Sequence, residues 1–425
     1  MRAFGSLLEA YFKESDPEIA AALDRVLDRR DLTIDEAVKL FRAKGADLTL
    51  LVMVADYLRR KRVGNLVTYV VNRNVNFTNV CVKRCGFCAF SRDHRTEEGY
   101  FLPTEEIIRR VKQAREYGAT EVCIQAGLAP GVDGGLYARL VRAIKAEVPE
   151  IHIHAFSPEE IKYASKRKGV DFKEILLELR EAGIGSIPGT AAEILDQGVR
   201  DTISPGRIRV SEWVDIVKTA HRLGIPTTAT IMYGHIETDE QRVRHIALIR
   251  DIQKETGGFT EFVPLSFVHW EAPMYMKKLI DAEYRLPTGA DVLRLYAVSR
   301  IMLNDYIPNI QVTWVKEGKK FSQIALNAGA NDFGGTLMNE SISTAAGASN
   351  GQLVSPKEFK RMIFDLGRVP AERSTLYRIL KVHEENEASD HPLDTVEDVE
   401  ATFGSYGALV KMNEYRFVNT KFISG

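Results

Sequence analysis

Short runs of apolar and β-branched residues alternate with helical patterns from about residue 66 to residue 335 of this chain. Glycine or proline separates the units, as is typical of the turns that join strands to helices. Repeated strand–helix–strand units connect through right-handed crossovers and so predict a parallel sheet. The predicted strands are residues 67–78, 121–125, 151–156, 227–232, 261–267 and 310–314, with a weaker one at 183–187.

The helical segments between these strands carry recognisable start signals. Ser157 is followed three residues later by Glu160, and Thr238 is followed at the same distance by Gln241. This is the spacing of a capping box, in which the two side chains satisfy backbone groups of the first helical turn. A helix is therefore predicted to begin directly after each of these two positions.

About six to eight such units in roughly 270 residues fit a full or partial (β/α) barrel of the TIM type, an α/β fold, better than an open doubly wound sheet. The dinucleotide fingerprint of the open sheet is incomplete, because Gly183 and Gly185 lack a third glycine. In such barrels the chemistry belongs to the carboxyl ends of the strands. The expected parts are an N-terminal helical segment (1–63), the barrel core (64–335), a barrel-capping segment (336–380) and an acidic linker with a tail (381–425).

The composition is that of an ordinary globular protein, and it narrows the choice of partners. Its 57 Lys and Arg against 58 Asp and Glu give a net charge of −1. A balanced charge does not attract nucleic acid or an anionic membrane, so we expect neither as a partner. The basic run at 59–62 is interpreted as four cations on a final helical turn. The longest apolar stretch, 48–55, is too short to span a membrane, and no signal region is visible, which predicts a cytoplasmic protein.

Three of the four cysteines, Cys81, Cys85 and Cys88, lie close together directly after the first predicted strand, with the spacing C-x3-C-x2-C. In a reducing compartment a tight cysteine cluster indicates metal binding rather than disulfides. A structural zinc site is closed by four ligands, whereas a 4Fe-4S cluster held by three thiolates keeps one iron open for a small molecule. The fourth cysteine, Cys123, lies in the second predicted strand and is expected in the core.

The sequence leaves two other metal sites as alternatives. A zinc knuckle would recruit His94, six positions after Cys88, as its fourth ligand. A metal-dependent barrel hydrolase would start from the pair His152 and His154, which share one face of a strand. The ligands of that hydrolase site would be His152, His154, His235, His269 and Asp332. The hydrolase alternative leaves the three clustered cysteines unexplained.

The segment 76–90 resembles the radical S-adenosylmethionine (SAM) superfamily, in which C-x3-C-x-aromatic-C follows the first strand of a (β/α) barrel. The resemblance implies such a barrel with helical N-terminal and mixed C-terminal extensions. It also implies that Cys81, Cys85 and Cys88 hold one 4Fe-4S cluster, with SAM on the open iron. The reduced cluster then cleaves SAM to methionine and a 5′-deoxyadenosyl radical. Phe87 matches the aromatic position near the adenine.

Further motifs are similar to the group that contains deazaflavin (FO) synthase and the radical enzymes of the futalosine route to menaquinone. These motifs lie at 153–158, 188–195, 232–237 and 256–265. Residues 332–340, which read DFGGTLMNE, most resemble the tyrosine-using subunit of FO synthase. The likeness spans about residues 20 to 380 and does not extend to the final segment of the chain.

This resemblance implies a transferase that cleaves the Cα–Cβ bond of L-tyrosine. The 4-hydroxybenzyl group would be joined to C5 of 5-amino-6-(D-ribitylamino)uracil, with release of 2-iminoacetate, methionine and 5′-deoxyadenosine. The implied partners are a reductant protein and a second radical SAM subunit that closes the deazaflavin ring. The alternative within the group is a futalosine enzyme of the cyclic dehypoxanthine futalosine or aminofutalosine synthase type.

The same resemblance implies roles for residues at the strand ends. Gln125 and Gly127 match the place where the superfamily meets the amino group of SAM. Glu193 matches a ribose or amino-acid contact, and Met232 lies where the backbone approaches adenine. The expected substrate contacts are Tyr233, His235 and Glu237.

Overall fold

The strands of the barrel are short, and nearly all of them run parallel. The computed structural model describes residues 9–280, 286–385 and 390–417. Its strands are β1 (Leu66–Val70), β2 (Asn72–Val75), β3 (Glu121–Ile124), β4 (His152–Ala155), β5 (Thr227–Tyr233), β6 (Phe259–Ser266), β7 (Asp332–Gly335), β8 (Val369–Arg373) and β9 (Ile379–Val382). Only Val71 separates β1 from β2, so the predicted strand at 67–78 is present as one shorter, interrupted run.

Successive parallel pairings lead around a closed ring. β7 pairs with β1, β2 with β3, β3 with β4, and β5 with β6. Single parallel bridges fill the remaining positions: His154–Ser186, Ile187–Thr227, Phe262–Ile310 and Gln311–Asp332. Because β2 continues β1, the cycle is complete, and the predicted (β/α) barrel is confirmed. The predicted strands at 183–187 and 310–314 contribute only these bridges.

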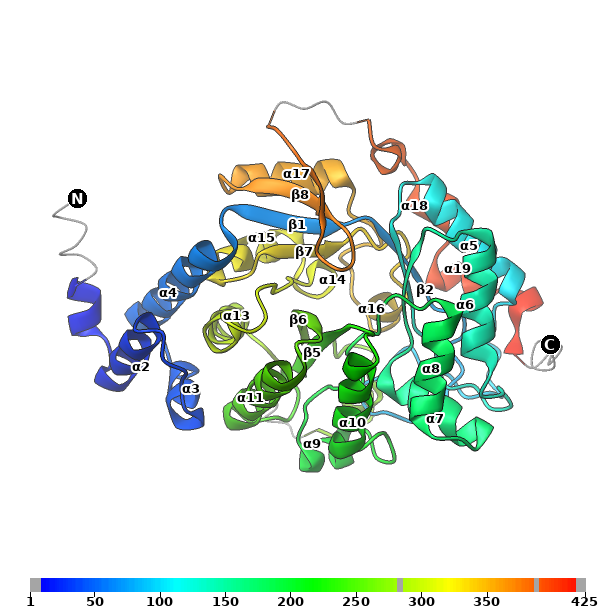
Figure 1. Ribbon diagram of the computed structural model, residues 1–425, viewed down its shortest axis with the longest axis horizontal. Helices are drawn as coiled ribbons and strands as arrows, with labels where there is room; N and C mark the ends of the chain where they lie inside the picture. The colour runs from blue at the N-terminus through cyan, green and yellow to red at the C-terminus, as the bar shows by residue number, and fades with distance from the viewer. Residues whose placement is uncertain (1–8, 281–285, 386–389, 418–425) are drawn as a thin grey trace.

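Helices surround the ring of strands (Figure 1). They are α2 (Pro17–Leu27), α3 (Ile34–Leu40), α4 (Ala46–Val63), α5 (Thr104–Glu116), α6 (Leu136–Glu147), α7 (Pro158–Lys168), α8 (Phe172–Ala182), α9 (Gln197–Ile203), α10 (Val210–Arg222), α11 (Asp239–Thr256), α12 (Pro273–Met276), α13 (Gly289–Leu303), α14 (Trp314–Glu317), α15 (Lys319–Ala325), α16 (Ile342–Ala345), α17 (Pro356–Asp365), α18 (Val399–Phe403) and α19 (Tyr406–Leu409). Short 3-10 turns are η1 (Leu326–Ala328), η2 (Pro392–Thr395) and η3 (Asn413–Tyr415).

The helix starts follow the predicted capping chemistry. The hydroxyl of Ser157 accepts the N–H of Glu160 at the start of α7 (3.3 Å), and that of Thr238 accepts the N–H of Gln241 at the start of α11 (3.2 Å). Each partner side chain reaches back to the capping residue, so both capping boxes are complete. The basic run at 59–62 closes α4, where cations interact favourably with the helix dipole.

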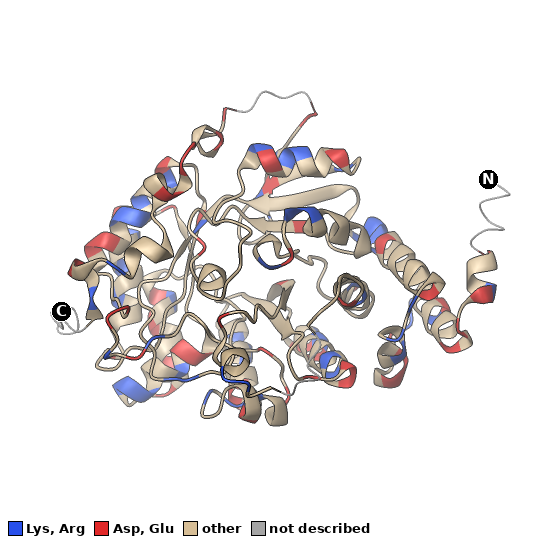
Figure 2. Cartoon of the chain, turned by 180° about the vertical axis from the view of Figure 1, so that it is seen from behind, with Lys and Arg blue, Asp and Glu red and all other residues tan. Residues whose placement is uncertain are grey.

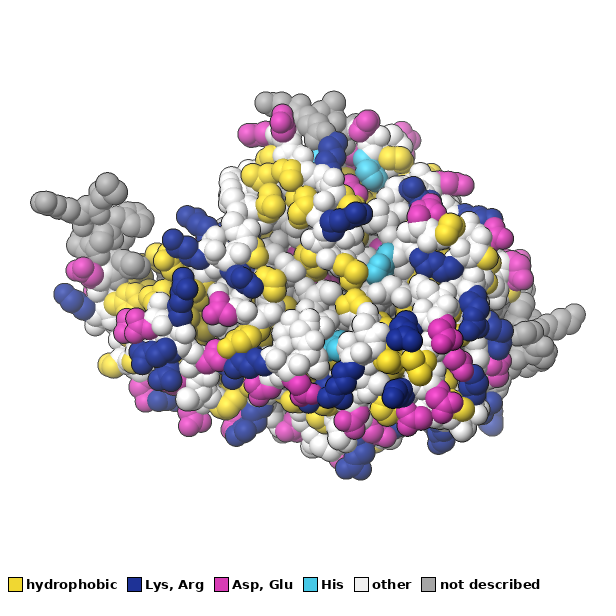
Figure 3. Space-filling model, in the orientation of Figure 1, with side chains coloured by type: hydrophobic (Ala, Val, Ile, Leu, Met, Phe, Trp, Pro, Cys, Tyr) yellow, Lys and Arg dark blue, Asp and Glu magenta, His cyan; other side chains and the backbone are white. Residues whose placement is uncertain are grey.

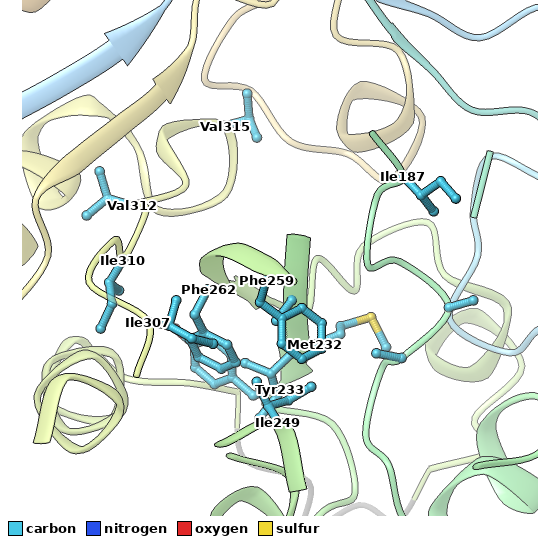
Figure 4. Close-up of a cluster of buried hydrophobic side chains, with 14 of the residues drawn as sticks. Ile187, Met232, Tyr233, Ile249, Phe259, Phe262, Ile307, Ile310, Val312 and Val315 are labelled. Atoms are coloured by element: carbon cyan, nitrogen blue, oxygen red, sulfur yellow. The ribbon is translucent and has the colours of Figure 1, made fainter. Parts of the chain in front are cut away.

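Apolar side chains from β5, β6 and the segment before β7 pack together in the core (Figure 4). Phe262 and Ile310 are fully buried there and are joined by a parallel bridge between their strands. Trp314 is also buried, and its indole N–H donates to the carbonyl of Gly335 at 3.0 Å. The hydrogen bond gives the polar end of this large side chain a partner inside the core.

A hairpin formed by β8 and β9 lies within the predicted capping segment 336–380 and its border. β8 pairs in parallel with β1 and so extends the sheet, while β9 pairs antiparallel with β8. In Figure 1 the orange chain after β8 reaches over the opening of the ring. Arg373 at the end of β8 donates two hydrogen bonds to Asp332 at the start of β7, at 2.5 and 2.9 Å. The hairpin is therefore fastened to the end of the barrel at which the strands begin.

The last described segment, 390–417, packs against the outside of the first strand–helix unit. Phe101 donates its N–H to the carbonyl of Tyr415 at 2.8 Å. The rings of Phe90 and Tyr406 lie 5.6 Å apart. Phe90 belongs to the cysteine segment 76–90, so the contact with Tyr406 packs the C-terminal segment against the cysteine segment. The residues 386–389 and 418–425 of the predicted linker and tail lie outside the described residues.

Charges of both signs are mixed over the outer helices (Figure 2), in keeping with the net charge of −1. In the space-filling view most charged side chains lie toward the rim, and the centre of the face is mainly uncharged (Figure 3). Among the helices of the described residues, none combines the length and the apolar character that a membrane span requires.

The ion pair between Arg373 and Asp332 should contribute strongly to stability. Both side chains are buried, and removing one partner leaves an uncompensated charge in the core. We expect Arg373→Met to lower the free energy of unfolding by about 3 to 5 kcal/mol in chemical denaturation. Arg378→Met, which removes an exposed arginine of the same hairpin, should change it by less than about 0.5 kcal/mol. Equal effects of the two variants would contradict this assignment.

Candidate active site

The cysteine segment 76–90 leaves the carboxyl end of β2 and is held by buried polar side chains. The hydroxyl of Thr78 donates to the carbonyl of Tyr100 at 2.6 Å. The amide of Asn79 donates to the carbonyl of Glu98 and accepts the N–H of Tyr100, both at 2.9 Å. Thr78 and Asn79 are fully buried, so these bonds satisfy loop backbone that water does not reach. These bonds therefore fix the path of the segment.

The thiols of Cys81, Cys85 and Cys88 line one cavity of about 240 Å³, called here the cysteine cavity. Burial raises the pKa of all three thiols, that of Cys85 to about 12, and the nearby Arg207 guanidinium acts in the opposite direction. A thiolate in such a place requires a compensating positive charge, which metal ions supply.

The arrangement of the thiols fits a cluster better than a single ion. Within residues 9–280, 286–385 and 390–417, no three His, Cys, Asp or Glu side chains converge on the position of one ion. An iron–sulfur cluster binds each thiolate at a different iron, so its cysteines need not converge on one point. His94 does not line the cavity and pairs instead with Asp93 at 3.5 Å. The geometry therefore gives no support to the zinc knuckle.

A network of buried charges forms another wall of the cysteine cavity. The guanidinium of Arg207 donates to Glu193 at 2.8 Å and lies 3.7 Å from Glu159. It also lies 5.4 Å from the centre of the Phe87 ring. Glu159 is 3.6 Å from the ammonium of Lys83, which belongs to the cysteine segment. The network joins the cysteine segment to the loops after later strands and fixes both in position.

Two wall residues, Ala191 and Glu193, have positive φ angles of 65° and 43°. Side chains other than glycine rarely adopt this region, and such strained residues cluster at functional sites. The strain turns the loop so that the Glu193 carboxylate faces Arg207 while its carbonyl accepts the N–H of Met232 at 2.9 Å. The loop and the end of β5 are thereby held together beside the cavity.

The five residues predicted to contact SAM all line the cysteine cavity: Phe87, Gln125, Gly127, Glu193 and Met232. Gly127 has a packing reason in addition, because a Cβ atom there would lie 2.3 Å from the carbonyl oxygen of Val80. The N–H of Gly127 donates to the carbonyl of Thr78 at 2.8 Å. Which atoms of SAM each residue meets stays a prediction.

Tyr233, His235 and Glu237, the predicted substrate contacts, do not line the cysteine cavity. The hydroxyl of Tyr233 donates to Glu317 at 3.1 Å. His235 accepts the N–H of Ile236 and contacts the carbonyl of Met232 with its other ring nitrogen. The Glu237 carboxylate is fully buried and accepts from backbone N–H groups and from Arg242. These contacts hold the loop after β5 in place, and the role of the three side chains as substrate contacts stays a prediction.

The two histidines of β4 also form hydrogen bonds within the chain. His152 and His154 both bond the hydroxyl of Ser186, at 2.8 and 2.6 Å. Burial lowers the pKa of His154 to about 4, although Glu121 acts against this shift. Asp332, a further predicted ligand of the hydrolase alternative, forms a buried ion pair with Arg373. These side chains do not gather into a two-metal site.

Several cavity residues were not predicted from the sequence. Arg207 and Lys316 line the cavity without belonging to any of the motifs, and the sequence predicts Glu160 only as a capping residue. Burial raises the pKa of Glu160 to about 7, while Ser157 acts to lower it. Lys316 lies two residues after the end of the predicted strand at 310–314, and this position near a strand end is the signal that could have found it. Arg207 lies between two helices and had none.

Comparison with known proteins gives the family. Residues 75–249 match the family model of the radical SAM superfamily, and residues 256–386 match the CofH/MqnC C-terminal region. The chain is 50% identical over 358 residues to the 5-amino-6-(D-ribitylamino)uracil–L-tyrosine 4-hydroxyphenyl transferase of Methanothermobacter thermautotrophicus, which covers 84% of this chain and 96% of that protein. The chain belongs to this family of radical SAM transferases. A second member, transferase 1 of Methanosarcina barkeri, is 54% identical over 324 residues, or 76% of this chain and 85% of its own.

Two solved structures of differently named proteins share the fold. Methylornithine synthase is 20% identical, has a TM-score of 0.62, and covers 82% of this chain and 97% of its own. The hydrogenase maturase HydG from Carboxydothermus hydrogenoformans is 16% identical, has a TM-score of 0.67, and covers 89% of this chain and 84% of its own. Family membership confirms the predicted 4Fe-4S cluster and SAM as cofactors, and the barrel-hydrolase alternative is wrong.

The chain contains its own control for the cluster ligands. Cys123 lies in β3, is only half-buried rather than in the core as predicted, and contacts Gln125 at 3.6 Å. We expect Cys81→Ala, Cys85→Ala and Cys88→Ala each to abolish the iron and sulfide content after anaerobic reconstitution, because each removes one cluster ligand. Cys123→Ala should keep the wild-type content of both. Loss of the cluster in Cys123→Ala alone would overturn the ligand assignment.

Proposed function

We propose that this chain transfers the 4-hydroxybenzyl group of L-tyrosine to C5 of 5-amino-6-(D-ribitylamino)uracil. The Cα–Cβ bond of tyrosine breaks, a bond to C5 of the uracil forms, and 2-iminoacetate, methionine and 5′-deoxyadenosine are released. The observation that carries this proposal is the sequence identity of 50% to the 5-amino-6-(D-ribitylamino)uracil–L-tyrosine 4-hydroxyphenyl transferase of Methanothermobacter thermautotrophicus. The matched region covers 96% of that protein. The substrates in that name are the tyrosine and aminouracil of the proposed reaction.

The cysteine cavity suits the cofactors of this chemistry. Cys81, Cys85 and Cys88 would hold the cluster, and three thiolates leave the fourth iron for SAM. Glu159 and Glu193 line the cavity as ion-pair partners of Arg207, which holds both carboxylates beside the place that SAM would occupy. When bound, the reduced cluster and SAM supply a 5′-deoxyadenosyl radical that removes a hydrogen atom from tyrosine.

The residues of the chain orient and enclose the reactants. Arg207 keeps Glu193 and the ring of Phe87 in fixed positions beside the cysteine segment. Met232 and Phe267 add apolar walls to the cavity. A primary carbon radical reacts with any C–H bond nearby, so a wall of fixed side chains that excludes water and other partners favours the intended reaction.

The wider setting of the reaction is also part of the proposal. We propose that a reductant protein delivers the electron and that a second radical SAM subunit closes the deazaflavin ring on the product. The match of residues 256–386 to the CofH/MqnC C-terminal region supports this proposal. Cytoplasmic conditions, which keep thiols reduced, suit a cysteine-held cluster.

A product assay tests the proposed function and separates it from the futalosine alternative. The reconstituted protein with SAM and dithionite receives L-tyrosine and the diaminouracil in one mixture, and dehypoxanthine futalosine in another. We expect mass spectrometry to detect 5′-deoxyadenosine and a hydroxybenzylated uracil only in the first mixture. Conversion of the futalosine, without any adduct from tyrosine, is the result that would reject the proposal.

A further inference from the structure

A second cavity of about 250 Å³ lies beside the cysteine cavity and is called here the side cavity. Phe267, Val268 and Lys316 line both cavities, so these residues form the boundary between them. The segment after β6 that carries Phe267 and Val268 continues to Met274, whose N–H donates to the carbonyl of Gly86 at 2.7 Å. The segment after β6 therefore lines the side cavity and also contacts the cysteine segment.

Lys316 lies on α14, the single helical turn at the carboxyl end of the 310–312 strand position. The backbone of this turn is fixed on both sides. Asn350 donates to the carbonyl of Val315 at 3.0 Å, and the side chain of Glu317 accepts the hydroxyl of Tyr233 at 3.1 Å. Trp314 is anchored in the core by its indole hydrogen bond. The lysine therefore projects from a rigid base, as a precise binding contact requires.

The ammonium of Lys316 has no hydrogen bond or ion pair with any residue that the structure describes. The other charged side chains around the two cavities have partners: Lys83 with Glu159, Arg207 with Glu193, Glu160 with Ser157, and Glu317 with Tyr233. Burial lowers the pKa of Lys316, although Glu340, Glu317 and Glu193 act against this shift from a distance. A half-buried cation without a direct partner is stabilised when an anionic ligand supplies one.

The remainder of the side cavity suits an aromatic ring that carries a hydroxyl group. His269 is buried, and its Nε2 atom has no hydrogen-bond partner among the described residues. Burial lowers the pKa of His269, so the ring is neutral near pH 7 and can exchange a hydrogen bond with a hydroxyl. Trp270 lies 4.1 Å from the His269 ring and adds aromatic surface to the wall.

We propose that Lys316 binds the α-carboxylate of the L-tyrosine substrate and that the phenol ring of this substrate lies in the side cavity. The inference rests on the proposed function, since tyrosine is the substrate assigned there. Of the two substrates, tyrosine alone carries a carboxylate, whereas the aminouracil is a neutral ring with a polyol chain. A carboxylate on the shared boundary places the neighbouring Cα and amino group next to the cysteine cavity, where hydrogen removal takes place. Lys316 is a binding residue that determines which substrate occupies the side cavity.

The test compares Lys316→Met with Lys320→Met in the reconstituted holoenzyme. Lys320 is an exposed lysine on the next helix, α15, and serves as the matched control. A hydrogen bond between charged groups is strong, so we expect Lys316→Met to raise the KM and the calorimetric Kd for L-tyrosine at least about tenfold. The KM for the diaminouracil should remain within about twofold, and Lys316→Arg should recover part of the lost tyrosine affinity. Lys320→Met should match the wild type.

Tyramine, which is tyrosine without its carboxylate, provides a second readout. Its inhibition constant should be the same in the wild type and in Lys316→Met, because it offers no group for the lysine to bind. An unchanged Kd for L-tyrosine in Lys316→Met, or a raised KM for the uracil instead, overturns the inference. Melting temperature and iron content of the variant verify that it is folded and loaded. If the wild type neither binds L-tyrosine nor forms the adduct, the proposed function itself fails, which is a separate result.

Discussion

Three thiols must be presented to different irons of one cluster while the fourth iron stays open, and the rest of the structure depends on this constraint. A loop free to move would not keep the sulfur atoms in place, and a fourth nearby ligand would close the site. The chain meets both demands with backbone anchors. The side chains of Thr78 and Asn79 donate hydrogen bonds to the backbone of the same loop. At Gly127 the loop after β3 packs directly against the backbone of Val80. The closed ring of parallel strands supplies the rigid base for these contacts.

Buried charge has a different task at each end of the barrel. Where the strands begin, Arg373 and Asp332 fasten the C-terminal hairpin to the ring. At the opposite end, Arg207 joins Glu193 and Glu159 into one wall of the cysteine cavity. Paired groups of this kind hold a fixed arrangement because separating either partner leaves an unpaired charge in the protein interior. Lys316 departs from this pattern, and a ligand carboxylate is the partner that would complete it.

The sequence predicted those features that depend on local patterns. The strand–helix alternation predicted the barrel, and the cysteine spacing predicted an open metal site, since both patterns are carried by neighbouring residues. β7, β8 and β9 were missed because Asp332–Gly335 lacks an apolar pattern, Pro370 interrupts β8, and all four residues of β9 are exposed. The hydrogen bond from the Tyr233 hydroxyl to Glu317 joins the end of β5 to α14, and no local pattern predicts it. Pairings between residues so distant in the chain depend on the folded packing, and no local pattern records them.

EPR spectroscopy tests most directly whether three thiolates hold a 4Fe-4S cluster with one iron free for SAM. The anaerobically reconstituted protein is reduced with dithionite, and its spectrum is recorded with and without SAM. A signal of a reduced 4Fe-4S cluster should appear, and its g values should change when SAM is added, because SAM binds the open iron directly. A reduced-cluster signal that saturating SAM leaves unaltered, or a colourless protein that retains zinc in place of iron, would contradict this arrangement.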